Sequence, residues 1–409
     1  MMGNDMDKTK PLTGIRVLDL GVFVAGPYAT SILASLGAEV VKVEPPDGGD
    51  PFRRGVNADS HYFIQMNAGK KSIAVNLKSP DGVALVRTMV PHYDVLIENM
   101  RPGKLDALGL GVAELKKLNP SIVCASVSGF GDGGPWRDRA AYDTIGLSMS
   151  GFLSIMSDAN RPQLAGTCIG DLVTALGAVI GVLACLVGRG LDPERHGADI
   201  QTSLLEAMSL VTIDAITQLY ETDVTPSRQT RHPQAQSFCP ITADGRALAL
   251  HLSSSEKFWQ ALLKAIERPD LAEDPRFKGF RSRMANYSEL RLLVEEAFLK
   301  RDRQEWERRL IENDVPFAPV LTAKELVAHP QMEWLQLFER GEDGTMLVRS
   351  PLRFSGQRPE RHLKVPVIGE HSREIALRTL PIAEVNRLLA TGVLVQADAP
   401  VSHREGTRS

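Results

Sequence analysis

The chain has 409 residues, of which 43% are hydrophobic and 24% are charged. This length leaves room for two or three folded domains. Its 47 Lys and Arg residues against 50 Asp and Glu residues give a formal net charge of −3, so it lacks the basic excess that retains proteins on nucleic acids or anionic membranes. We therefore expect neither a nucleic acid nor a membrane among its partners.

The N-terminal segment and the cysteines indicate where the chain works. The first residues, MMGNDMDKTKP, have no apolar stretch behind their charges, which predicts no secretory signal and a cytoplasmic location. The cysteines show neither a CxxC nor a Cys/His ligand spacing, so no zinc site and no disulfide framework are expected. They are interpreted as small buried residues: Cys124, Cys168, Cys185 and Cys239.

Strand-like and helix-like stretches alternate from residue 15 to residue 127. Expected strands cover 15–20, 40–43, 72–77, 94–97 and 122–127, and expected helices include 28–36 and 80–90. Ser79 is the expected N-cap of the second helix, and Pro80 takes its first helical position. Repeated β-α-β alternation is typical of a mostly parallel sheet covered on both faces. The pattern predicts the α/β class, with a Rossmann-like large domain.

A stretch of sixteen uncharged, mostly apolar residues follows at 172–187, between Asp171 and Arg189. It is shorter than the about 20 residues needed to cross a bilayer, so we expect a buried core helix. Small residues recur in it at helical spacing and would let another backbone approach, in the core or across a dimer: Gly177, Gly181, Ala184 and Gly188.

The second half of the chain has a different pattern of predicted elements. A second helix is expected over 203–219 and a polar linker over 221–236, before a smaller α+β domain whose first strands flank an Asp244-Gly245 turn. The predicted organisation is a large domain over 1–205, a linker helix over 206–228, a small domain over 229–320, a return to the large domain over 321–396 and a tail over 397–409.

Asp171 is the most informative single residue, because it stands between Cys168-Ile169-Gly170 and the uncharged stretch. An aspartate at the start of a helix commonly caps it. A carboxylate at a helix N-terminus is also expected to stay ionised, and in apolar surroundings it is poorly hydrated, which suits a nucleophile. The local pattern leaves both interpretations open.

Glycine-rich and basic segments are candidates for phosphate binding. Gly129–Gly134 matches GxGxxG, but no apolar helix follows it, so a nicotinamide or flavin site is not expected. The helix start at Ala25-Gly26-Pro27 is the better anion site, with basic groups in 67–72 and 99–104 as further candidates. The chain has neither a hydrolase elbow nor an HExxH or P-loop motif, which disfavours hydrolase and kinase activities.

Eight segments carry a family pattern in register: VLDLGVFVAGPYAT, LGAEVVKVEPP, NAGKKSIAVNLKSPDG, DVLIENMRPG, SVSGFGDGGP, GTCIGD, VPFAPV and IGEHS. Together they resemble the class III CoA-transferases, the family of formyl-CoA and crotonobetainyl-CoA:carnitine CoA-transferases that also contains the α-methylacyl-CoA racemases. The resemblance runs from about residue 12 to 379. It implies a Rossmann-like large domain, a smaller α/β domain and an interlocked homodimer.

The resemblance also implies a reaction. Asp171 falls on the family's catalytic aspartate, which attacks the thioester of an acyl-CoA donor. The covalent route then passes through an aspartyl-acyl anhydride, an aspartyl-CoA thioester and a second anhydride, before CoA reaches a free carboxylic acid. CoA and acyl-CoA are substrates in this scheme, and no permanently bound cofactor or metal is implied.

Binding residues carry over position by position. The family's CoA-contacting stretches fall on Val24, Ala25, Val75, Asn76, Leu77, Lys78, Asn99, Met100, Arg101, Tyr142 and Asp143. Tyr62 and Tyr142 fall where relatives place aromatic residues of the substrate pocket. Val24, Ala107 and Ala140 stand where formyl-CoA transferase has glutamine, arginine and lysine, so oxalate is not the expected acceptor.

Two alternatives stay open beside CoA transfer. Racemases of the family pair the aspartate with a histidine, but this chain reads Arg139-Ala140-Ala141-Tyr142-Asp143, with a tyrosine at that position. Tyrosine, with a pKa near 10, is a poor proton shuttle at neutral pH. The other alternative is a protein that binds CoA without turnover. For the acceptor, the tyrosines and nearby arginines favour a small polar or dicarboxylic acid.

Overall fold

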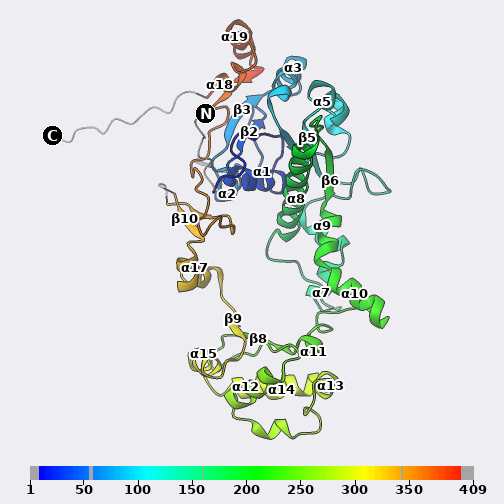
Figure 1. Ribbon diagram of the computed structural model, residues 1–409, viewed down its shortest axis with the longest axis vertical. Coiled ribbons are helices and arrows are strands. Elements are labelled where there is room, and N and C mark those ends of the chain that lie inside the picture. The colour runs from blue at the N-terminus through cyan, green and yellow to red at the C-terminus, as the bar shows by residue number, and fades with distance from the viewer. Residues whose placement is uncertain (1–8, 55–58, 159, 342–343, 398–409) are drawn as a thin grey trace, which may run out of the picture. The chain divides into compact units, whose positions relative to one another are not determined.

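The computed structural model describes residues 9–54, 59–158, 160–341 and 344–397. They form two compact units, each with its own hydrophobic core (Figure 1). The larger unit takes three stretches of chain, namely residues up to Leu153, Leu164–Ile213 and residues from Gln336 onward. The smaller unit consists of Ser154–Gln163 and Asp214–Leu335, and so contains the stretch 229–320. The predicted domain boundaries themselves stay predictions.

A seven-stranded sheet in the order β12-β3-β2-β1-β4-β5-β6 is the centre of the larger unit. Its strands are β1 (Arg16–Asp19), β2 (Glu39–Glu44), β3 (Lys71–Val75), β4 (Val95–Glu98), β5 (Val123–Ser128), β6 (Asp199–Ser203) and β12 (Leu394–Val395). Pairing is parallel from β3 to β6, and β12 adds an antiparallel edge. The predicted α/β class with a mostly parallel sheet is confirmed. The sequence does not predict the two edge strands, because β6 is polar (DIQTS) and β12 is very short.

Neighbouring residues of a strand face opposite sides of this sheet, and both sides are covered. In β1, Val17 packs in one core with α1 (Ala25–Ser35) and α8 (Ile169–Leu191), and Leu18 packs in the other with α3 (Pro80–Met89). Both side chains are fully buried. Apolar runs without alternation are what a doubly covered parallel sheet requires, which is why the sequence predicts its central strands.

Helix α8 is longer than the apolar stretch predicts. It runs for 23 residues through the charged Asp171 and Arg189, so by length and composition it is able to cross a membrane. The expectation that it is too short is therefore wrong. The expectation of a core helix holds for one face, where Ala178 and Val182 are buried against the sheet. The close approach predicted at Gly181 is made by strand β6 and not by another helix. A Cβ at Gly181 would lie 2.8 Å from Ile200 Cγ2, so glycine permits this contact.

The opposite face of α8 is apolar and exposed. Its exposed residues fall four and seven positions apart, which places them along one stripe of the helix: Leu176, Ile180, Val187 and Leu191. The predicted burial is thus wrong for this stripe, since in the single chain nothing from the described residues covers it.

The helix predicted over 203–219 is broken in two. It forms α9 (Leu204–Val211) and α10 (Ile213–Thr222), with a break at Thr212, whose hydroxyl donates a hydrogen bond to the Ser150 carbonyl at 3.2 Å. Asp223 has φ +54°, in the left-handed region, and ends α10. The predicted linker helix over 206–228 is therefore wrong in its continuity and its end.

The smaller unit combines a three-stranded antiparallel sheet with helices. Strand β8 (Leu248–His251) pairs with β7 (Ser237–Phe238) and β9 (Phe317–Pro319). Gly245, at φ +76°, lies in the turn between β7 and β8, as the Asp-Gly pair predicts. The core combines aliphatic side chains with aromatic ones, and the rings of Phe298 and Trp306 stack with centroids 4.3 Å apart.

The remaining elements connect and flank these two units. In the larger unit they are α2 (His61–Asn67), α4 (Lys104–Ala107), α5 (Val112–Leu118), α6 (Asp143–Met149), β10 (Phe338–Arg340), β11 (Met346–Val348), α18 (Ser372–Ala376) and α19 (Ile382–Ala390). The smaller unit adds α11 (His232–Ala235), α12 (Glu256–Ala265), α13 (Phe280–Ala285), α14 (Tyr287–Phe298), α15 (Arg303–Glu312), α16 (Ala323–Val327) and α17 (Pro330–Leu335), and α7 (Phe152–Met156) lies where the chain passes between the units.

Candidate active site

The strand order places a ligand site in the larger unit. The chain runs from β1 to β2 and β3 on one side, and continues with β4, β5 and β6 on the other. In open α/β sheets, ligands bind outside the carboxyl ends of the strands at such a switch point, here between β1 and β4. The turn after β1 and the residues after β4 are therefore expected to border the ligand site.

A cavity at this switch point gathers most of the predicted residues. It is lined by the turn after β1, the ends of β4 and β5, the start of α6 and the start of α8. The predicted residues among its lining are Val24, Ala25, Asn99, Met100, Arg101, Tyr142 and Asp171. Because Val24 and Ala25 line it, the cavity borders the start of α1, the helix start predicted as an anion site, and no side chain caps that start.

Asp171 lies in the first turn of α8, but it does not cap that helix. Instead, Oδ1 of Asp143, at the start of α6, accepts hydrogen bonds from the N–H groups of Gly170 at 2.8 Å and Asp171 at 3.2 Å. Of the two interpretations left open for Asp171, the cap is therefore wrong, because a residue 28 positions earlier takes that role. Among the described residues, no group hydrogen-bonds to the Asp171 carboxylate. That carboxylate lines the cavity.

Burial raises the pKa of Asp171 to about 7, and the neighbouring Asp143 carboxylate adds to the shift. The N-terminus of α8 acts in the other direction, since its dipole favours a negative charge. Desolvation outweighs it, so the expectation that the helix N-terminus keeps this group fully ionised is wrong near neutral pH. Asp171 is poised between its two protonation states at physiological pH.

Asn99 builds the turn beside Asp171. Its Oδ1 accepts a hydrogen bond from the N–H of Val22 at 2.8 Å, and its Nδ2 donates to the Val22 carbonyl at 2.8 Å. Gly26 permits this approach, because a Cβ there would lie 3.3 Å from Asn99 Cγ. Asn99 thus fixes the position of the cavity wall at Val22.

The predicted stretch from Val75 to Lys78 lies in an adjoining groove. This groove is largely apolar, with Leu20, Val43 and Leu77 in its wall, and it shares Val22 and Met100 with the Asp171 cavity. The two hollows therefore lie side by side at the carboxyl end of the sheet.

Tyr62 lies outside both hollows and is highly exposed, at 70%. An aromatic row nevertheless connects it to the cavity. Ring centroids are 5.7 Å apart between Tyr62 and Phe52, 6.1 Å between Phe52 and Phe23, and 5.8 Å between Phe23 and Tyr142. Sequence reasoning missed Phe23 and Phe52, although Phe23 directly precedes the predicted Val24.

Two arginines give the cavity a positive edge. Neither Arg101 nor Arg139 forms an ion pair with a described acidic residue. The guanidinium carbon of Arg139 lies 3.9 Å from the centroid of the Trp136 ring. Arg137, in contrast, is neutralised by Asp132 and Asp138. Unpaired guanidinium groups suit phosphates or carboxylates of a ligand.

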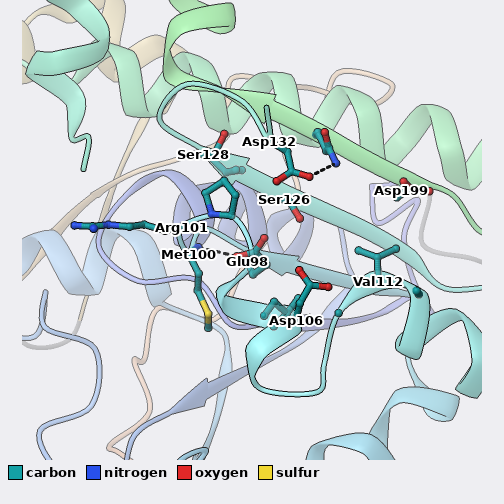
Figure 2. Close-up of a pocket in the computed structure, with 16 residues that line it drawn as sticks. Glu98, Met100, Arg101, Asp106, Val112, Ser126, Ser128, Asp132 and Asp199 are labelled. Carbon is teal, nitrogen blue, oxygen red and sulfur yellow. Dashed lines mark hydrogen bonds between the residues drawn. The ribbon is translucent and has the colours of Figure 1, made fainter. Parts of the chain in front are cut away.

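An acidic hollow lies on the other side of Arg101. Figure 2 shows Glu98, Asp106 and Asp132 around it, with the Arg101 guanidinium directed away from them. Glu98 Oε2 accepts a hydrogen bond from the Met100 N–H at 2.7 Å, and burial raises the pKa of its carboxyl group. None of the described carboxylates around this hollow belongs to the lining of the Asp171 cavity. Within the described ranges, no group of three or more His, Cys, Asp or Glu side chains is arranged to hold a metal ion.

The larger cavity of the smaller unit contains none of the predicted residues. It has a volume of about 700 Å³, against about 190 Å³ for the Asp171 cavity. Its lining combines Phe238, Tyr287 and Phe317 with the basic side chains of Arg228 and Arg291. The chemistry of the lining, and not the volume, therefore identifies the Asp171 cavity as the candidate active site.

Comparison with known proteins agrees with this fold. Residues 12–372 match the family described as CoA-transferase family III. The chain is 34% identical to a succinate–glutarate CoA-transferase of Agrobacterium fabrum, covering 91% of this chain and 96% of that protein. It is 32% identical to a succinyl-CoA–D-citramalate CoA-transferase of Chloroflexus aurantiacus, with coverages of 92% and 95%. A crystal structure of a CAIB/BAIF family protein from Brucella suis superposes with a TM-score of 0.80, at 30% identity over 91% of this chain and all of that one.

The protein is thus an α/β enzyme with a carboxylate in the cavity at its switch point. The chain belongs to CoA-transferase family III.

Proposed function

We propose that the protein transfers CoA from an acyl-CoA to a free carboxylic acid, with Asp171 as the nucleophile. The observation that carries this proposal is the Asp171 carboxylate, which lines the cavity at the switch point, accepts no hydrogen bond from described residues and lies near Arg101 and Arg139. A carboxylate stripped of hydrogen bonds is reactive once it is deprotonated.

The first half of the reaction forms the enzyme-bound thioester. A carboxylate oxygen of Asp171 attacks the carbonyl carbon of the donor thioester, and the C–S bond breaks. CoA thiolate is the leaving group, and the product on Asp171 is an aspartyl-acyl anhydride. The thiolate then attacks the Asp171 carbonyl carbon of that anhydride. This releases the donor as a free carboxylate and leaves CoA on Asp171 as a thioester, so the activated bond is conserved.

The second half repeats these steps with the acceptor. Its carboxylate attacks the aspartyl thioester and expels CoA thiolate, which gives a second anhydride. The thiolate attacks the acceptor's carbonyl carbon in this anhydride, and the Asp171 carboxylate leaves. Arg101 and Arg139 offset the negative charges of CoA and the acids, and the N-terminus of α8 favours the returning carboxylate.

The groove at Val75–Lys78 suits the nucleotide end of CoA. Its apolar walls match a base, and it joins the Asp171 cavity at Val22 and Met100. Asp143 is the exception among the predicted CoA contacts, since its Oδ1 is occupied by the backbone of α8. We therefore propose a positioning role for Asp143 in place of CoA contact.

For the acids, we propose short dicarboxylates. The unpaired arginines support this choice, and so do the two relatives whose names state succinate, glutarate and citramalate as substrates. Short dicarboxylyl-CoA donors should outperform long-chain acyl-CoA donors in steady-state assays. Equal or faster rates with long chains would remove the dicarboxylate proposal.

The deciding experiment is mass spectrometry after mixing the protein with a panel of acyl-CoAs and quenching with hydroxylamine or borohydride. We expect a modification confined to Asp171 and absent in Asp171→Asn. Absence of any label, with exchange of the α-hydrogen for solvent deuterium, would favour a racemase. Unchanged CoA binding by Asp171→Asn without turnover of any donor by the wild type would favour a binding protein.

We also propose a homodimer that works in the cytoplasm. The exposed apolar stripe of α8 includes Ile180 and Val187, and burial of this stripe against a second copy of the chain would remove it from water. The Asp171 cavity at the N-terminal end of the same helix is reached by water-soluble CoA esters, which argues against burial of this helix in a bilayer.

A further inference from the structure

Four charged side chains are buried behind the turn that joins β1 to α1: Asp19, Lys42, Asp50 and Lys70. Each is at most 4% exposed. They come from the end of β1, from β2, from the loop after β2 and from the residue before β3. Buried charges are costly unless they are paired and hydrogen-bonded, so the contacts of this cluster show what it maintains.

Asp50 and Lys42 hold the turn directly. Asp50 Oδ1 accepts hydrogen bonds from the N–H of Phe23 at 3.2 Å and from that of Phe52 at 2.9 Å. Lys42 Nζ donates to the Gly21 carbonyl at 2.6 Å and forms an ion pair with Asp50 Oδ2 at 2.9 Å. The pair thus holds the backbone of the turn at both Gly21 and Phe23.

Asp19 and Lys70 hold the two flanks of the turn. Lys70 Nζ lies 2.8 Å from Asp19 Oδ2 and donates to the Pro27 carbonyl in α1 at 2.9 Å. Asp19 Oδ1 accepts from the N–H of Gly21 at 2.9 Å. With both flanks fixed, the contacts of Asp50 decide the conformation at Phe23.

Phe23 requires such a contact, because its φ of +63° is in the left-handed region, which disfavours side chains other than glycine. In this conformation Phe23 lines the Asp171 cavity, and its ring contacts Tyr142 edge to face. Its ring also contacts Phe52, whose N–H is held by the same Asp50 oxygen. A change at Asp50 is therefore transmitted to the aromatic wall.

We propose that Asp50 is a positioning residue for the reaction: together with Lys42 it holds Phe23 in its left-handed conformation and thereby fixes the cavity wall next to Asp171. This inference rests on the proposed function, because it assigns the wall to the donor acyl group. The nucleotide end of CoA, which we propose to lie in the groove of Val75–Lys78, is not expected to respond.

The test uses succinyl-CoA and follows the rate at which Asp171 takes up the hydroxylamine-sensitive label. Asp50→Ala removes both the charge and the acceptor, whereas Asp50→Asn keeps an oxygen for the two N–H groups. We expect Asp50→Ala to slow labelling at saturating succinyl-CoA about tenfold and Asp50→Asn about threefold, with KM changed less than about twofold. Glu256→Gln is the stability control, since it removes the negative charge that pairs with the buried Arg283 in the smaller unit and should lower the Tm but not the rate.

A double variant separates positioning from stability. Glycine adopts positive φ without cost, so Phe23→Gly should make the turn less dependent on Asp50. The loss caused by Asp50→Ala should shrink in that background, and additive losses would contradict the role of Asp50. If Asp50→Ala does not fold, a wild-type labelling rate in Asp50→Asn overturns the inference. A wild-type protein that takes no label overturns the proposed function itself.

Discussion

Two carboxylates lie beside the N-terminus of α8, Asp171 in its first turn and Asp143 from the start of α6, and they have different tasks. Asp143 accepts the helix N–H groups, and this leaves the neighbouring Asp171 carboxylate free in the cavity. The charge of Asp143 also contributes to the raised pKa of Asp171. Asp143 thus positions Asp171 and adds to the increase in its pKa that burial causes.

The rate of Asp171 labelling should therefore depend on pH. Only the deprotonated carboxylate attacks, so the rate should rise with pH and reach half its maximum near pH 7, the raised pKa of Asp171. Asp143→Asn keeps an oxygen for the helix N–H groups but removes the charge, so the midpoint should shift to lower pH. A midpoint that stays constant in this variant would show that Asp143 has no electrostatic effect.

The same pKa predicts an effect on stability. A carboxyl group whose pKa is raised by folding stabilises the fold below its unfolded pKa, and this contribution is lost as pH rises through about 7. At pH 8, Asp171→Asn should raise the free energy of unfolding by roughly 1–3 kcal/mol, less than the full shift implies because solvent screens the group. Denaturant melts at pH 5 and pH 8 check this, and the gain should be smaller at pH 5, where the folded carboxyl group is protonated. A variant less stable than wild type at pH 8 would contradict the assignment.

At the scale of elements, the turn after β3 depends on a glycine in the next helix. A Cβ at Gly82, in α3, would lie 2.1 Å from the Asn76 carbonyl oxygen, so only glycine lets the helix start against this turn. The turn carries Asn76, Leu77 and Lys78 of the groove proposed for CoA.

Gly82→Ala should therefore displace the turn and weaken CoA binding by about fivefold or more, which isothermal titration calorimetry measures. Gly279→Ala is the matched control, because a Cβ at Gly279 meets no atom within 4 Å. Equal CoA affinity in Gly82→Ala and wild type would exclude the turn from the binding site.

Elements in the centre of the larger unit are predictable, because their signals are local. Val17 and Leu18 belong to a strand buried on both faces, and such strands need apolar residues throughout. The cap of α8 was not predictable, since Asp143 reaches Gly170 across 27 residues. The aromatic wall was missed for the same reason: Phe23 and Phe52 meet through tertiary packing, and nothing near them in sequence indicates it.

At the scale of the whole molecule, the apolar stripe of α8 predicts self-association. Ile180→Glu should place a charge in the proposed dimer contact and convert a dimer to a monomer in analytical ultracentrifugation. Ile382→Glu is the control, because Ile382 is similarly exposed but lies on α19. A wild-type protein that sediments as a monomer at micromolar concentration would contradict the dimer.

The antiparallel edge strand has a consequence for biosynthesis. Strand β3 pairs with β12 through Val75 and Leu394, and the Ala74 N–H is occupied by Ser372 Oγ at 3.0 Å. A ribosome delivers these partners about 300 residues after β3, whereas the stretch Asp214–Leu335 of the smaller unit is complete earlier. The nascent sheet therefore keeps an open edge while these roughly 300 residues are translated, and chains that stall before β12 would expose it to aggregation and to chaperones.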